Sequence, residues 1–104
     1  MRAITLFLTV LFIGINHLSI AATIQGKINN ANGEAIAAAN IVLQLGSDSS
    51  IQKLTLTNDS GYFEFSDIKK GVYFIKVIAS GYLKYSSANF VLDSNFYLPA
   101  IAMR

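Results

Sequence analysis

Apolar and polar residues alternate with a period of two along most of this chain, and turn-forming residues interrupt the alternation every several residues. A clear case is the segment 72–79 (VYFIKVIA), where Tyr73, Ile75, Val77 and Ala79 share one face. Such alternation predicts β-strands. Without intervening helices, short strands favour an antiparallel sandwich or barrel, because parallel neighbours need crossovers of roughly a dozen residues or more.

About seven short strands are expected, joined by short polar loops. They lie at 23–29, 38–45, 51–57, 62–66 and 72–79, with one or two more between 83 and 98, and Pro99 ends the pattern. The alanine-rich run 34–40 (EAIAAAN) is too short to be a stable helix on its own and leads into β-branched residues. We therefore expect a loop there.

Glycines and aromatic residues in the segment 58–82 have a structural explanation. Gly61 follows residues 58–60 (NDS), whose side chains bond back to nearby amides, and a positive φ is cheap for glycine. We expect the same role for Gly71, a corner at Gly81, and a turn at residues 32–33 (NG). The rings expected to face the core are Phe63, Phe65 and Tyr73.

The N-terminus has the three-part pattern of a secretory signal peptide. Arg2 precedes an apolar run at 3–15, and Ser19 and Ala21 supply small residues at the cleavage positions. We expect a helical signal peptide at 1–21, with Ala22 as the second choice of cleavage site, and one β-sandwich domain at 22–104. An uncleaved anchor helix is the alternative, but a span needs roughly 18 or more unbroken apolar residues.

Cleavage would remove the single histidine, His17, and leave a domain that also lacks cysteine. Of eight Lys and Arg residues, Arg2 leaves with the leader, so seven cations face six Asp and Glu. This near-neutral charge argues against binding to nucleic acid or anionic lipid. Without disulfides, the domain must be stabilised by its apolar core.

No arrangement of residues predicts catalysis. Serine nucleophiles need a base such as histidine, and zinc needs His or Cys ligands. The nearest carboxylates, Asp59, Glu64 and Asp67, are expected in turns or on an outer strand face. Two loops, 47–50 and 58–60, supply oxygens but too few ligands for calcium. We expect no catalytic, cofactor-binding or metal-binding residues and no enzymatic activity.

Binding surfaces are the remaining candidates. Exposed tyrosine rings could stack on sugars, which makes a small secreted carbohydrate-binding domain the alternative function; the candidates are Tyr62, Tyr82, Tyr85 and Tyr97. The segment 88–92 (ANFVL), which has no charge, is the expected edge strand for pairing with a partner. Lys69 and Lys70 are expected to lie in a turn, with both side chains in solvent.

Several spaced elements agree in order with one known family. The sequence resembles the carboxypeptidase-regulatory-like domain, a transthyretin-like, Ig-like β-sandwich, through Gly26, 33–36 (GEAI), 39–43 (ANIVL), 57–65 (TNDSGYFEF), 68–77 (IKKGVYFIKV) and 81–82 (GY). The resemblance covers nearly the whole domain and implies seven antiparallel strands in a Greek key. Ala35 departs from the pattern, because the family usually has proline there.

The resemblance is to the version that follows the signal peptide of TonB-dependent receptors and other outer-membrane β-barrel proteins of the Bacteroidetes. It implies a periplasmic accessory domain, or a secreted one, with a scaffolding or interaction role. The implied partners are a receptor plug and barrel and the energy-transducing complex. The chain ends at Arg104, where such receptors continue, so it is either a truncated product or a stand-alone domain.

Overall fold

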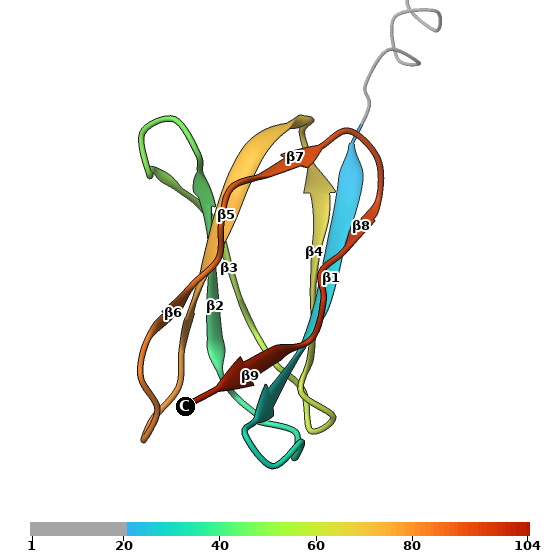
Figure 1. Ribbon diagram of the computed structural model, residues 1–104. Helices are drawn as coiled ribbons and strands as arrows, with labels where there is room; N and C mark the ends of the chain where they lie inside the picture. Colours follow the sequence, from blue (N-terminus) through green and yellow to red (C-terminus); the bar gives the residue numbers. More distant parts are fainter. Residues whose placement is uncertain (1–20) are drawn as a thin grey trace, which may run out of the picture.

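A computed structural model describes residues 21–104, and their regular secondary structure consists of β-strands (Figure 1). The predicted signal peptide lies outside the described residues except for Ala21. Within the described part, no helix is long and apolar enough to cross a membrane. The nine strands are β1 (Ala22–Asn30), β2 (Asn40–Leu45), β3 (Ile51–Leu56), β4 (Tyr62–Ile68), β5 (Gly71–Ile78), β6 (Tyr85–Ser86), β7 (Phe90–Leu92), β8 (Phe96–Tyr97) and β9 (Ile101–Met103).

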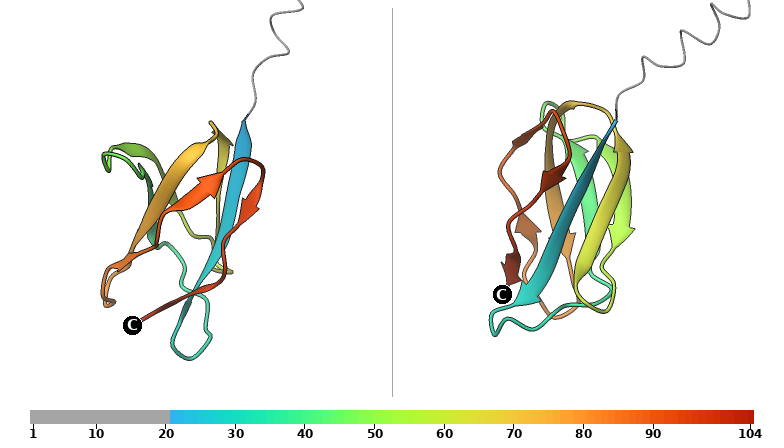
Figure 2. Two further views of the ribbon diagram at one scale, coloured as in Figure 1. Left: turned by 45° about the horizontal axis from the view of Figure 1, so that its top comes forward. Right: turned by 90° about the vertical axis from the view of Figure 1, so that its right-hand side faces the viewer.

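Two sheets face each other as the layers of a sandwich (Figures 1 and 2). One sheet has the order β4-β1-β8, and β9 also pairs with β1. The other has the order β3-β2-β5-β6, and β7 also pairs with β5. The predicted all-β sandwich is confirmed.

The C-terminal third differs in detail from the expectation. Three short strands lie between residues 83 and 98 where one or two were expected, and β9 follows Pro99, which was predicted to end the pattern. Both β8 and β9 run parallel to β1. Parallel neighbours need a long connection between them, and here the strands of the opposite sheet, which come between β1 and β8 in the chain, provide it.

The core lies between the sheets and is built by the predicted alternation. Phe63, Phe65 and Tyr73 are buried, and the two phenylalanine rings meet edge to face with centroids 6.0 Å apart. Gly26 of β1 lies directly against the Phe63 ring. A Cβ atom at this position would be 2.5 Å from the ring, so a larger residue would force the ring to move. The C-terminal segment adds buried side chains that the pattern did not predict, namely Leu92, Leu98, Ile101 and Met103.

Turn chemistry follows the sequence at most positions. Gly33, Gly61 and Gly81 have positive φ, and the Asn58 side chain accepts hydrogen bonds from the N–H groups of Ser60 and Tyr62, as expected. The prediction for Gly71 is wrong. The residue with positive φ near this turn is Asp67 (φ 58°), close to the end of β4. Gly71 is the first residue of β5 and packs against the Tyr73 ring.

The alanine-rich segment 34–40 forms a loop that leads into β2, as predicted. Its anchor is the buried Thr57. The Thr57 hydroxyl donates to the carbonyl oxygen of Ile36 (2.6 Å) and accepts from the N–H of Ala39 (2.9 Å). The second half of the loop is therefore bound, at Ile36 and Ala39, to the residue that follows β3.

Candidate binding surfaces

The three acidic residues considered for acid–base chemistry lie in different surroundings. Asp59 is exposed in the turn before β4, and Asp67 is exposed near the end of β4. Glu64 lies on the outer face of β4, where its carboxylate accepts hydrogen bonds from Tyr62, Gln25 and Ser66. This arrangement contains no carboxylate pair facing a shared cleft.

In each of the two candidate calcium loops, one side-chain oxygen accepts hydrogen bonds from nearby backbone N–H groups. Asp48 accepts the backbone N–H of Ser50 (3.0 Å), which lowers the pKa of this exposed carboxyl group below its usual value. Asn58 binds two N–H groups of its own turn. Among residues 21–104, no group of three His, Cys, Asp or Glu side chains could hold a metal ion.

The four candidate tyrosines divide between the two sheets. Tyr62 and Tyr97 lie on the outer face of the β4-β1-β8 sheet, and Tyr97 is 60% exposed. Between them is Gln25 of β1, which is paired with Glu64 on one side and with Tyr97 on the other. This surface, which we call the tyrosine face, combines a free aromatic ring with an amide and a carboxylate.

The hydroxyl group of Tyr62 is part of this surface. It donates to Oε1 of Glu64 (3.0 Å). The pKa of Tyr62 is raised above its usual value, first by desolvation, then by this hydrogen bond and the negative charge of Glu64. Tyr62 is therefore a hydrogen-bond donor under ordinary conditions and not a base.

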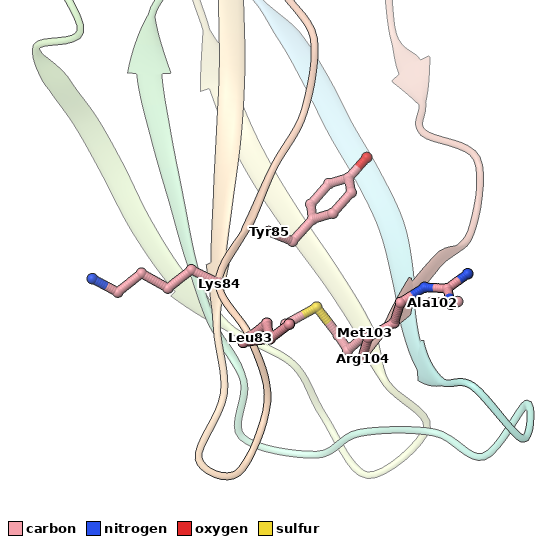
Figure 3. A pocket seen from close by; sticks show the side chains of 6 residues that line it. All are labelled: Leu83, Lys84, Tyr85, Ala102, Met103 and Arg104. Carbon is pink, nitrogen blue, oxygen red and sulfur yellow. The ribbon is translucent and has the colours of Figure 1, made fainter.

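Tyr82 and Tyr85 lie elsewhere. Tyr82 is half-buried against the core, and Tyr85 lines a cavity of about 240 Å³ between β6 and β9. Figure 3 shows the Tyr85 ring and Leu83 on one side of the cavity, Met103 and Arg104 on the other, and the Lys84 amine pointing away. No acid or nucleophile with an activating base lines it.

A second cavity of about 240 Å³ lies at the ends of β3 and β4 and the start of β5. Its polar lining includes Lys53, Asp67 and Lys69. The Lys53 amine donates to the backbone carbonyl oxygen of Ser66 (2.9 Å), and Tyr73 binds the carbonyl oxygen of Lys69 (2.7 Å). These groups hold the corner of the sandwich together, and both Lys69 and Lys70 are exposed as expected.

The outward side of the β3-β2-β5 sheet carries many apolar side chains, with Asn40, Gln44 and Lys76 between them. Strand pairing places Leu54 beside Val42, Leu56 beside Asn40, and Val72 beside Val91. Among these, Leu54 is 68% exposed and Leu56 is 56% exposed. We call this surface the outer apolar face; its members are Val42, Ile51, Leu54, Leu56, Val72, Phe74, Ile78 and Val91. Lys76 is the charged residue of β5 that lies among them.

The predicted edge segment 88–92 contains β7, which pairs with β5 as an edge strand of this sheet. It is short, and Phe90 stacks on Phe96 of β8 with ring centroids 5.0 Å apart. The longer edge is β3, at the opposite side. Its two leucines, Leu54 and Leu56, lie on one face, and that face is turned to solvent.

The comparisons with known proteins agree with this architecture. The family model of the carboxypeptidase regulatory-like domain matches residues 23–98. No match was found among curated protein sequences.

Solved structures with similar folds come from varied proteins. A chain of a type II Cohesin-X-Dockerin complex from Acetivibrio cellulolyticus has a TM-score of 0.64 at 24% identity, over 79% of this chain and 56% of that one. The 5-hydroxyisourate hydrolase of Klebsiella pneumoniae has a TM-score of 0.58 at 18% identity, over 78% and 84% of the two chains. The group B streptococcus pilus 2b backbone protein has a TM-score of 0.64 at 16% identity, over 80% and 40%. At these identities the likeness shows the fold alone.

Proposed function

Because this chain belongs to the carboxypeptidase regulatory-like domain family over residues 23–98, we propose that it is a non-catalytic, exported β-sandwich module with a scaffolding or interaction role. The observation that supports this most is the outer apolar face. Contiguous exposed apolar side chains on a small domain are typical of protein interaction sites.

We further propose that the module is the periplasmic N-terminal accessory domain of a TonB-dependent outer-membrane receptor-like protein. The predicted signal peptide directly before the domain supports export, and the resemblance to the Bacteroidetes receptor modules supports the context. The partners would then be the receptor plug and barrel or the energy-transducing complex. The outer apolar face lies on the outside of the sandwich, so a partner can contact it while the core stays buried.

Site-specific photocrosslinking in cells tests this role. A photoreactive amino acid at Leu54 samples the outer apolar face, and one at Lys27 samples the opposite sheet as a matched control. We expect an adduct from Leu54 with an outer-membrane receptor component and none from Lys27. Recovery of the chain from the cytoplasm, or no receptor adduct from Leu54, would contradict the proposal.

The tyrosine face supports carbohydrate binding as a second candidate function. An exposed ring beside an amide and a carboxylate offers stacking and hydrogen bonding to one sugar residue. Calorimetry with soluble oligosaccharides would test it on Tyr97→Ala, with Tyr85→Ala as the control from the other sheet. Loss of binding in Tyr97→Ala alone supports the function, and equal binding by both variants contradicts this location.

A further inference from the structure

Strand β3 is the open edge of its sheet, and Figure 2 shows it at the rim of the sandwich. Thr57 donates its N–H to the carbonyl oxygen of Ala39 (3.0 Å), so the backbone groups of Thr57 face β2. In an antiparallel ladder this direction alternates along the strand. Leu54 and Leu56 therefore direct their N–H and C=O groups away from β2, toward the open side.

The same two residues belong to the outer apolar face. Their neighbours across β2 are Val42 and, through Asn40, Ile78. One short segment thus combines unpaired backbone groups with exposed leucine side chains. This combination favours pairing with another strand.

The half of β3 that carries Leu54 and Leu56 has no bulge, because the register shift in its pairing with β2 lies between Ile51 and Lys53. Edge strands are commonly protected by charges, proline, bulges or short length. Lys53 is the charged residue of β3, and its amine donates a hydrogen bond to the backbone carbonyl oxygen of Ser66. The other edges differ: β4 has Glu64 and Asp67 exposed, and β6 and β7 are only two and three residues long.

We propose that β3 pairs with β3 of a second copy of this chain, antiparallel about a two-fold axis at Thr55. In this register Leu54 lies opposite Leu56 of the second copy, and both residues direct their backbone groups into the interface. Lys53 then lies opposite Thr57, so like charges do not meet. The segment is self-complementary, as a two-fold interface requires.

The pairing joins two sheets into one continuous sheet and brings the two outer apolar faces edge to edge. Leu54 and Leu56 from each copy form cross-strand pairs, which stabilise antiparallel neighbours. An interface of one strand edge falls below about 1,200 Å² of buried surface, where association is weak. We therefore expect a dimer that forms as protein concentration rises.

Analytical ultracentrifugation of the chain purified after export tests the dimer. We expect the mass to rise from one copy to a plateau at two copies. Leu54→Pro removes an N–H that faces the open edge and none from the β2 ladder, so it should leave the fold intact and the chain monomeric. Val91→Lys is the control, because Val91 is 65% exposed on the same face but far from β3 in the sheet. It should still dimerise.

Amide hydrogen exchange gives an independent readout. In the dimer the N–H groups of Leu54 and Leu56 should gain protection, while that of Thr55 should not change because it already faces β2. A wild-type chain that stays monomeric, or a mass that grows without a plateau, would overturn the proposal. Dimerisation lost in Val91→Lys but kept in Leu54→Pro would also overturn it.

This inference rests on the proposed interaction role, but the two can fail separately. A monomeric wild-type chain that still forms the receptor adduct at Leu54 would remove the dimer and keep the role. A dimer with no receptor adduct would support the dimer and contradict the receptor role.

Discussion

At the scale of single residues, buried polar side chains determine how the loops are held. Thr57 satisfies two backbone groups, at Ile36 and Ala39, in the loop between β1 and β2. Thr57→Val keeps the shape but leaves the N–H of Ala39 and the carbonyl oxygen of Ile36 unpaired. We expect the free energy of unfolding to fall by about 1–3 kcal/mol.

Urea denaturation followed by circular dichroism measures this loss. Thr55→Val is the matched control, since the Thr55 hydroxyl makes no hydrogen bond within the described residues. Equal stability of the two variants would contradict the role assigned to Thr57.

Tyr62 is expected to ionise at a higher pH than an ordinary tyrosine, whose pKa is about 10. As the pH rises past that value, the unfolded chain releases this proton before the folded protein does, so the folded state loses stability. Ultraviolet titration of the phenolate, with Tyr62→Phe to assign the signal, measures the shift. Glu64→Gln should lower the pKa of Tyr62, because it removes the negative charge beside the phenol; an unchanged titration would show that Glu64 does not contribute to the shift.

At the scale of elements, the three-residue β9 contributes more to the core than its length indicates. Ile101 and Met103 are buried and lie beside β1, and Met103 is 1% exposed. Met103→Ala should destabilise the domain by about 2–5 kcal/mol through the cavity it leaves. Val91→Ala, at an exposed position, should change thermal stability little, and a similar effect from both variants would show that β9 does not close the core.

The strands differ in how much their own sequence predicts. The alternation in β4 and β5 identified the residues that face the core, because one face of each strand packs against it. The same alternation in β3 did not show that its leucines face solvent. A period of two groups side chains by face, and only the packing of the two sheets decides which face is covered.

At the scale of the whole molecule, the start of β1 gives a prediction about processing. Ala22 is the first residue of β1, is buried and pairs with Ile68. Cleavage after Ala21 would leave the strand complete, so N-terminal sequencing of the exported protein should read Ala-Thr-Ile. A sequence beginning at Thr23 would mean that the mature domain lacks the residue paired with Ile68.

Local periodicity and the backbone preferences of glycine and asparagine were enough to predict the five longer strands, most turns and the core rings. The sequence also indicated the family and the lack of a histidine-dependent centre. The packing of the two sheets was needed to show that residues after Pro99 pair with β1, that Tyr62 and Tyr97 lie on one surface and Tyr85 on another, and that β3 has an unpaired edge. These features depend on which strands meet across the sandwich, and pairing between residues distant in the chain leaves no periodic signal in either strand.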